Sequence, residues 1–199
     1  MYRVVIATGE RKKFEDLVTR TLGDSPDGKY YLYQKDTALI LYNVDTDTRT
    51  NISQKAPVIF MDMEHPYPHE NPPFGVAGWT RDGKNVIINH KYDLWMLALD
   101  GSKAENITKI GDDQEIRFRH ISMDSEEDWI DTKKLLLLTA YGEWTKKEGF
   151  YELMIGSQPK SLVYDDMSYG RPIKAKNANK TFFTKQTFVD FPDYYRTPL

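Results

Sequence analysis

The sequence predicts an all-β protein built from β-propeller blades, and three observations support this fold class. Residues 25–53 align without a gap on residues 80–108, an internal repeat with an offset of 55 residues. Each copy contains short strands rich in β-branched and aromatic residues, separated by turns that contain Asp and Gly. Helical periodicity is nearly absent. Repeated units of this kind are typical of a propeller, whereas a β-sandwich, the main alternative, would not naturally produce a gap-free repeat.

The two copies of the repeat carry the same residues where a hairpin needs them. Turns are expected at Pro26–Gly28 and Arg81–Gly83, because Gly accepts a positive φ and Asp bonds to nearby backbone. Identical residues include Asp27, Gly28, Lys29, Leu39, Asp45 and Asn51, which fall on Asp82, Gly83, Lys84, Leu94, Asp100 and Asn106. Strands are predicted at 30–34 and 39–44 in the first copy and at 86–90 and 94–99 in the second, each followed by a short last strand.

Fainter units flank the two clear copies. Residues 4–11 resemble 42–49, as though the chain opened inside the outer hairpin of an earlier unit. A third unit has predicted strands at 134–140, 150–155 and 161–164, and a fourth begins at Ile173 with a strand at 180–185. The repeat units therefore lie near 1–14 (partial), 15–53, 75–108, 115–164 and 170–199 (partial), and we expect one domain, an incomplete propeller of about three to four blades. A short helical pattern occurs at 12–20.

Composition excludes several classes of partner. Of the 199 residues, 40% are hydrophobic and 29% charged, which is ordinary for a soluble globular protein. The net charge of −3 is scattered, so a nucleic-acid partner is not expected. The longest apolar run, 135–138, suits a buried strand and is too short for a membrane span. The absence of cysteine excludes disulfides and thiolate nucleophiles.

The N-terminal segment lacks the pattern of a secretory signal. This observation does not decide the cellular compartment of the protein. A cytoplasmic protein would fit, and so would a periplasmic or extracellular one if a longer parent protein carried the signal.

The blade segments SPDGKYYLYQ and LILYNVDTDTRTNIS resemble blades of the propellers in prolyl-oligopeptidase-like and dipeptidyl-peptidase-IV-like serine peptidases and in the Tol system. Residues 117–156 and 181–197 resemble the larger bacterial peptidases of this family. The resemblance implies a parent enzyme in which a propeller lies over an α/β-hydrolase domain and restricts and orients the access of peptide substrates. That hydrolase domain would be the partner of this chain.

Catalytic residues are not expected in the chain. A nucleophile elbow needs a Gly-x-Ser-x-Gly turn, which does not occur, and Gly101-Ser102 and Gly156-Ser157 have the pattern of hairpin turns. The expected function is thus the non-catalytic propeller portion of a prolyl-oligopeptidase-like peptidase. The alternative is a stand-alone binding module for a peptide, protein or glycan. A third class is a metal-dependent propeller enzyme, such as a polysaccharide lyase, using His65, His69 or His90.

The segment 61–73 contains the most chemically suggestive residues of the chain. Two histidines and three carboxylates fall inside a nine-residue stretch of this segment. Because Pro66 and Pro68 forbid the helix that would place His65 and His69 on one face, we expect an extended insertion between blades, with no metal and no cofactor. Substrate-binding residues are left unassigned.

The remaining candidates are predicted to be structural. His90 and His120 are isolated in or beside strands, and Trp79 and Trp95 are expected in the core. The acidic run 124–128 is expected to be a solvated turn, because it lacks the alternating ligands and glycine of a calcium loop. Asp93 is expected to cap a strand entry. Apolar faces of the terminal blades predict self-association.

Overall fold

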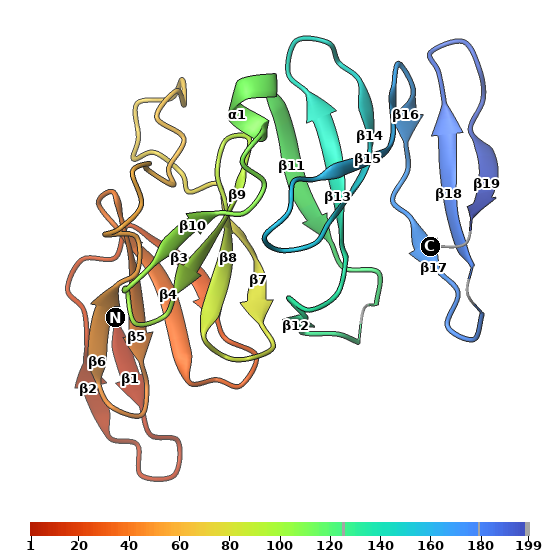
Figure 1. Ribbon diagram of the computed structural model, residues 1–199. Helices are drawn as coiled ribbons and strands as arrows, with labels where there is room; N and C mark the ends of the chain where they lie inside the picture. Colours follow the sequence, from red (N-terminus) through yellow and green to blue (C-terminus); the bar gives the residue numbers. More distant parts are fainter. Residues whose placement is uncertain (125, 179, 198–199) are drawn as a thin grey trace. The chain divides into compact units, whose positions relative to one another are not determined.

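The computed structural model describes residues 1–124, 126–178 and 180–197 (Figure 1). The chain divides into two compact units, one of Met1–Lys91 with Trp95–Glu105 and the other of Tyr92–Leu94 with Asn106–Leu199. The strands up to residue 106 are β1 (Tyr2–Val4), β2 (Arg11–Lys13), β3 (Arg20–Asp24), β4 (Tyr30–Lys35), β5 (Ala38–Asn43), β6 (Thr48–Asn51), β7 (Val76–Thr80), β8 (Asn85–Asn89), β9 (Leu94–Ala98) and β10 (Ala104–Asn106).

The elements after residue 106 are also almost entirely strands. They are α1 (Gly111–Gln114), β11 (Ile116–Ile121), β12 (Trp129–Ile130), β13 (Leu136–Gly142), β14 (Glu148–Leu153), β15 (Lys160–Asp165), β16 (Ser168–Tyr169), β17 (Ile173–Lys174), β18 (Thr181–Gln186) and β19 (Asp193–Thr197). The fold is all-β, made of antiparallel propeller-type blades, as the repeat predicted. The helical turn α1 was not predicted.

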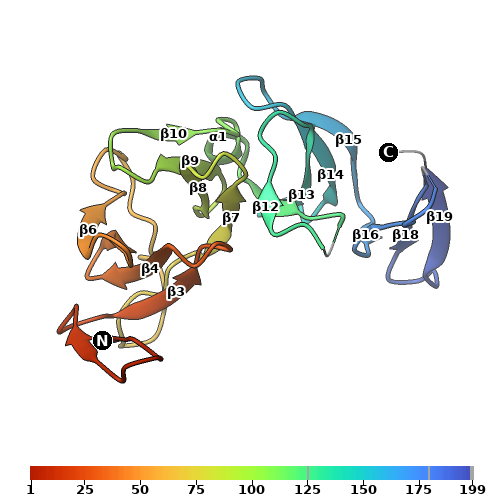
Figure 2. The same cartoon turned by 90° about the horizontal axis from the view of Figure 1, so that it is seen from below.

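Three sheets have the strand order of a propeller blade. In the first unit, β3, β4, β5 and β6 are neighbours in that order, and all three pairs are antiparallel. In the repeat copy, β7, β8, β9 and β10 follow the same order. In the second unit, β11, β13, β14 and β15 do so again, and Figure 2 shows β13, β14 and β15 of this sheet from below. The central strands of each sheet carry the buried side chains, including Leu32, Ile87 and Leu138.

The first turn of the repeat is closed by the same hydrogen bonds in both copies. Ser25 Oγ donates to Asp27 Oδ1 over 2.6 Å, and Thr80 Oγ1 donates to Asp82 Oδ1 over 2.6 Å. The strand that follows begins with a backbone N–H that donates to the same hydroxyl, from Tyr30 in one copy and Asn85 in the other. The turn motif therefore satisfies its own polar groups within six residues.

The end of each copy is also closed by matching contacts. Leu39 N donates to Ser53 Oγ and Leu94 N donates to Thr108 Oγ1, both over 3.0 Å. The amide oxygens of Asn51 and Asn106 accept from the backbone two residues ahead. The repeated Asn-Ile-Ser/Thr ending thus ties the last strand to its neighbour.

The predicted helical pattern at 12–20 was wrong. Part of this segment is β2, which pairs with β1, and no helix begins before β3. Phe14 instead lies buried with its ring stacked on Tyr42, the centroids 4.2 Å apart, and Arg49 donates to the Phe14 carbonyl oxygen. Packing against β5 overrides a helical pattern of only nine residues, which is too short to be stable without tertiary support.

Strand boundaries in the second unit differ from the prediction by one to two residues. The strand predicted at 134–140 is β13, which begins at Leu136, and Leu135 is 57% exposed although it belongs to the apolar run. The predicted fourth unit, 170–199, corresponds to β17, β18 and β19, but positions 179, 198 and 199 of it lie outside the described residues.

The C-terminal sheet of the second unit leaves much apolar surface exposed. Strand β18 pairs with β16 and β17 on one side and with β19 on the other (Figure 1). Phe188, Phe191 and Tyr194 are each more than four-fifths exposed. In the described part of the chain, no helix is long and apolar enough to cross a membrane.

Candidate functional site

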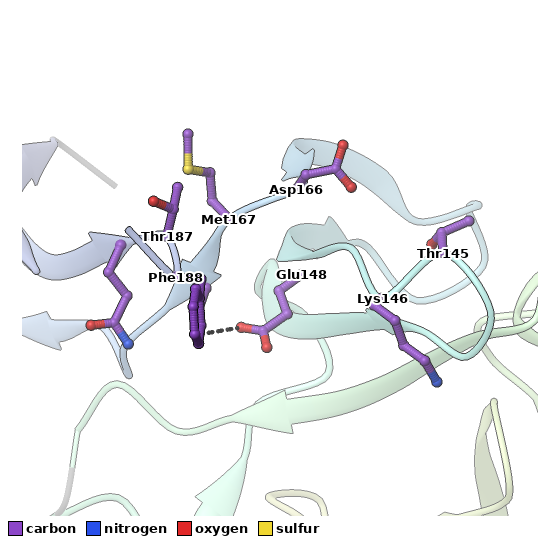
Figure 3. A pocket seen from close by; sticks show the side chains of 9 residues that line it. Thr145, Lys146, Glu148, Asp166, Met167, Thr187 and Phe188 are labelled. Carbon is purple, nitrogen blue, oxygen red and sulfur yellow. Dashed lines mark hydrogen bonds between the residues drawn. The ribbon is translucent and has the colours of Figure 1, made fainter. Parts of the chain in front are cut away.

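The candidate site is a polar hollow of about 570 Å³ in the second unit (Figure 3). It lies where the turn between β13 and β14, the β15–β16 connection and the end of β18 meet. Its lining residues are Thr145, Lys146, Glu148, Asp166, Met167, Ser168, Gln186, Thr187 and Phe188. The lining combines two carboxylates, an ammonium group, three hydroxyls and an amide with one aromatic ring.

Glu148 is the best-anchored polar group of this hollow. It is the first residue of β14 and is half-buried. Its Oε2 atom accepts hydrogen bonds from Ser168 Oγ over 3.2 Å and from Tyr169 N over 3.0 Å. Because both bonds go to one oxygen and no other described residue donates to Oε1, the carboxylate is oriented with one oxygen available to a ligand.

Tyr169 fixes the strand that holds Glu148 in place. Its hydroxyl donates to Asp165 Oδ1 over 2.9 Å, and its ring packs edge-on against Phe150, with centroids 5.4 Å apart. Burial, together with the hydrogen bond to the Asp165 carboxylate, raises the pKa of Tyr169 far above its usual range. The hydroxyl therefore remains a donor and holds β16 against the β14–β15 hairpin.

Lys146 and Phe188 lie on either side of Glu148 (Figure 3). Lys146 is in the tight turn between β13 and β14, where its φ is 58°, and its ammonium group donates to the Glu143 carbonyl oxygen. Phe188 follows β18, and its side chain is fully exposed at 105%. An exposed ring beside fixed polar groups offers both a stacking surface and hydrogen bonds to one ligand.

A second hollow of about 560 Å³ in the same unit is a weaker candidate. Its charges largely neutralise one another: Lys176 pairs with Glu126 over 2.9 Å, Lys160 lies 2.9 Å from Glu152, and Lys134 lies 4.0 Å from Glu127. A ligand would have to replace these ion pairs. The hollow around Glu148 has no such internal pairing among its described residues.

The predicted extended insertion at 61–73 is confirmed, but it brings its histidines together. No helix forms there, and the rings of His65 and His69 lie 4.6 Å apart between centroids. His69 Nδ1 contacts the Glu70 carbonyl oxygen over 2.8 Å, while Glu64 pairs with Lys91 over 2.8 Å. Within the described residues, no group of three or more His, Asp or Glu side chains is placed to hold a metal ion.

The other two histidines lie in structural surroundings, as predicted. His90 packs edge-on against Phe60 and Phe74, at centroid distances of 6.1 and 5.5 Å. His120 is in β11, and burial lowers its pKa below the usual value. Both rings thus contribute to packing.

The remaining structural predictions also have clear outcomes. Trp79 and Trp95 are buried, at 6% and 7% exposure, as predicted. Asp93 is buried and accepts a hydrogen bond from the Gly111 backbone N–H over 2.9 Å. Of the acidic run 124–128, Asp124, Glu126 and Asp128 are exposed, and position 125 lies outside the described residues.

Sequence reasoning missed every residue of the hollow. Glu148, Asp166 and Phe188 are up to 40 positions apart in the chain and follow no shared motif. The one sequence signal for this hollow was that its polar residues lie directly beside predicted strand ends. Loops at such ends often carry binding residues.

Comparisons with known proteins bear on the fold alone. No family model matches the chain, and no curated protein matches it. Similar solved structures include an oligogalacturonate lyase in complex with manganese, 11% identical with a TM-score of 0.42 over 99% of this chain and 67% of that one. Another is the oligogalacturonate lyase from Vibrio parahaemolyticus, 11% identical with a TM-score of 0.37 over 97% and 70%.

These findings correct the resemblance to the prolyl-oligopeptidase family. Both solved structures reported above are lyases, and no family model supports a peptidase. The physical reason lies in the segments that carried the resemblance. Ser25 and Asp27 close a turn, and Asn51 ties down a strand end, so these residues indicate a blade and not the enzyme that contains it.

Proposed function

We propose that this chain is a non-catalytic binding module that recognises a glycan at the hollow around Glu148. The observation that carries the proposal is the oriented Glu148 carboxylate, held through Oε2 by Ser168 and Tyr169 and open at Oε1. A carboxylate is an acceptor only, so its ligand must be a donor. Sugar hydroxyls are strong candidates, because each both donates and accepts.

The rest of the lining fits the same ligand class. Thr145 and Ser168 carry hydroxyls and Gln186 carries an amide, so the lining contains both donor and acceptor groups. The Thr187 hydroxyl is already bonded to Asp190. The exposed ring of Phe188 offers a face for the C–H side of a sugar ring.

The test is binding of an oligosaccharide panel, neutral and acidic, measured by titration calorimetry, with unstructured peptides as the second arm. We expect saccharide binding, a loss of about tenfold or more in affinity for Glu148→Ala, and a smaller loss for Phe188→Ala, as for other central contacts. Glu64→Gln, which changes an exposed carboxylate of the first unit, is the matched control. Binding of peptides alone, or saccharide binding unchanged in Glu148→Ala, would contradict the proposal.

A further inference from the structure

One aromatic ring beside the hollow lies close to two cations. The Arg117 guanidinium carbon lies 5.0 Å from the centre of the Tyr141 ring, and the Lys146 ammonium nitrogen lies 5.7 Å from it. Arg117 and Tyr141 are directly opposite each other on β11 and β13. Tyr141 in turn is opposite Glu148 on β14, so the three side chains form a row across one face of the sheet.

A third cation lies on the same face. Arg119 is two residues beyond Arg117 on β11, and side chains two apart in a strand share a face. Burial, and then the charge of Arg117, lower the pKa of Arg119 to about 10. Arg117 and Arg119 therefore place two guanidinium groups on the face of the sheet that carries Glu148 at the other end of the row.

Arg117 and Lys146 are not neutralised by the protein itself. Among the described residues, no carboxylate forms an ion pair with either of them, whereas Lys12 pairs with Asp47 and Lys91 with Glu64. Lys146 donates only to a backbone carbonyl oxygen, that of Glu143. Both cations are exposed, so an external anion can reach them.

Building on the proposed glycan site, we propose that Arg117, Tyr141 and Lys146 bind an oxyanion of the ligand, so that the ligand is an acidic glycan. The Arg117 fork suits two oxygens of a carboxylate or a sulfate ester, and Lys146 adds a point charge. Lys146 also lines the Glu148 hollow, so one sugar residue can place its oxyanion at the Lys146 ammonium group and its hydroxyls at Glu148.

The first experiment compares three ligands of one backbone by titration calorimetry. They are an oligosaccharide of hexuronic acids, its analogue with every carboxylate reduced to a primary alcohol, and that reduced analogue bearing sulfate esters. We expect at least one of the acidic ligands to bind about tenfold or more tightly than the reduced analogue, and this preference to shrink as salt rises from 50 to 500 mM. Which acidic ligand binds more tightly identifies the oxyanion.

The second experiment assigns the preference to the cluster. Arg117→Gln removes the exposed charge and should abolish the preference for the acidic ligand, because affinity for the acidic ligand should fall to that for the reduced analogue. Arg11→Gln is the matched control, because Arg11 lies 4.8 Å over the Tyr2 ring in the first unit. If Arg117→Gln does not fold, as judged by circular dichroism, Lys146→Gln tests the same loss of preference.

Three outcomes would count against the proposal, and they differ in what else they overturn. Equal binding of acidic and reduced ligands, or a preference that survives in Arg117→Gln, overturns the oxyanion site and leaves the glycan site standing. No binding of any of the three ligands overturns both.

Discussion

The hydroxyl of Thr108 donates a hydrogen bond to Oδ1 of Asp93 over 2.5 Å, and both side chains are buried. The same carboxylate accepts from the backbone N–H groups of Gly111 and Asp112, at 2.9 and 3.3 Å. A buried carboxylate with three donors thus joins the residue before β9 to the segment after β10 and to the start of α1.

Asp93→Ala should therefore lower the free energy of unfolding by about 2–3 kcal/mol, because the three donors lose a charged acceptor. Asp93→Asn should cost less, since its amide oxygen keeps one bond. Urea denaturation of both variants checks which of them loses more free energy of unfolding. Asp128→Asn, an exposed carboxylate, should change stability by less than about 0.5 kcal/mol. An Asp93→Ala variant as stable as Asp128→Asn would show that the network contributes nothing.

Gly149→Ala should destabilise the second unit by about 2 kcal/mol or more, because the added methyl would overlap the Val163 carbonyl oxygen of the paired strand β15. Gly156→Ala is the matched control. It has a φ of 95° but open space around its Cβ position, so only the backbone strain of about 1 kcal/mol applies. Thermal unfolding of both variants measures the two losses of stability. Equal losses would mean that β15 moves away from the added methyl group without a loss of free energy.

Glu15 should make the first unit sensitive to acid. Burial would raise the pKa of Glu15, but hydrogen bonds from Lys35 and Tyr33 outweigh it and lower the pKa from 4.5 to about 2. Because the folded-state pKa is the lower one, this stabilisation is complete above the unfolded value and is lost as the pH falls through the folded value.

The matching experiment measures the free energy of unfolding of Glu15→Gln from pH 7 to pH 2. At pH 7 the variant should be less stable than the natural chain by about 1 kcal/mol, and the difference should vanish toward pH 2. Glu10→Gln, an exposed neighbour in the same segment, should show no such convergence. A constant difference across the range would rule out the Glu15 ionisation as its source.

Thr80→Val and Ser25→Ala should destabilise by similar amounts, about 1–2 kcal/mol, since each leaves a backbone N–H without its acceptor, that of Asn85 or Tyr30. Double mutants with Asp82→Ala or Asp27→Ala would measure the coupling within each turn. Clearly unequal losses would show that the two copies of the turn have diverged in energy although their geometry is the same.

The strands could be predicted because their signals are local. Gly28 and Gly83 need the positive φ values of 70° and 65° that they adopt, and this requirement is visible in a few letters of sequence. The helical pattern at 12–20 misled for the opposite reason. Its outcome depends on the stacking of Phe14 on Tyr42, a contact between residues 28 positions apart that no local pattern contains.

The candidate site could not be predicted, because it forms where three separate connections end. Glu148 gains its orientation only when β16 places Ser168 and Tyr169 beside it. In the same way, the close approach of His65 and His69 follows from the path of a proline-rich loop. The way in which separate loops and sheets pack decides these contacts, and sequence spacing does not determine them.

The turns closed by Ser25 and Thr80 bear on how such a chain can arise. Each turn completes its hydrogen bonds within six residues, so a duplicated segment folds its hairpin without requiring the same neighbours as the original. The strands between the turns can then drift in sequence while their start and end points stay in place. In a blade of this type the residues that close the two ends must be kept, whereas the residues between them can change and can come to bind different ligands.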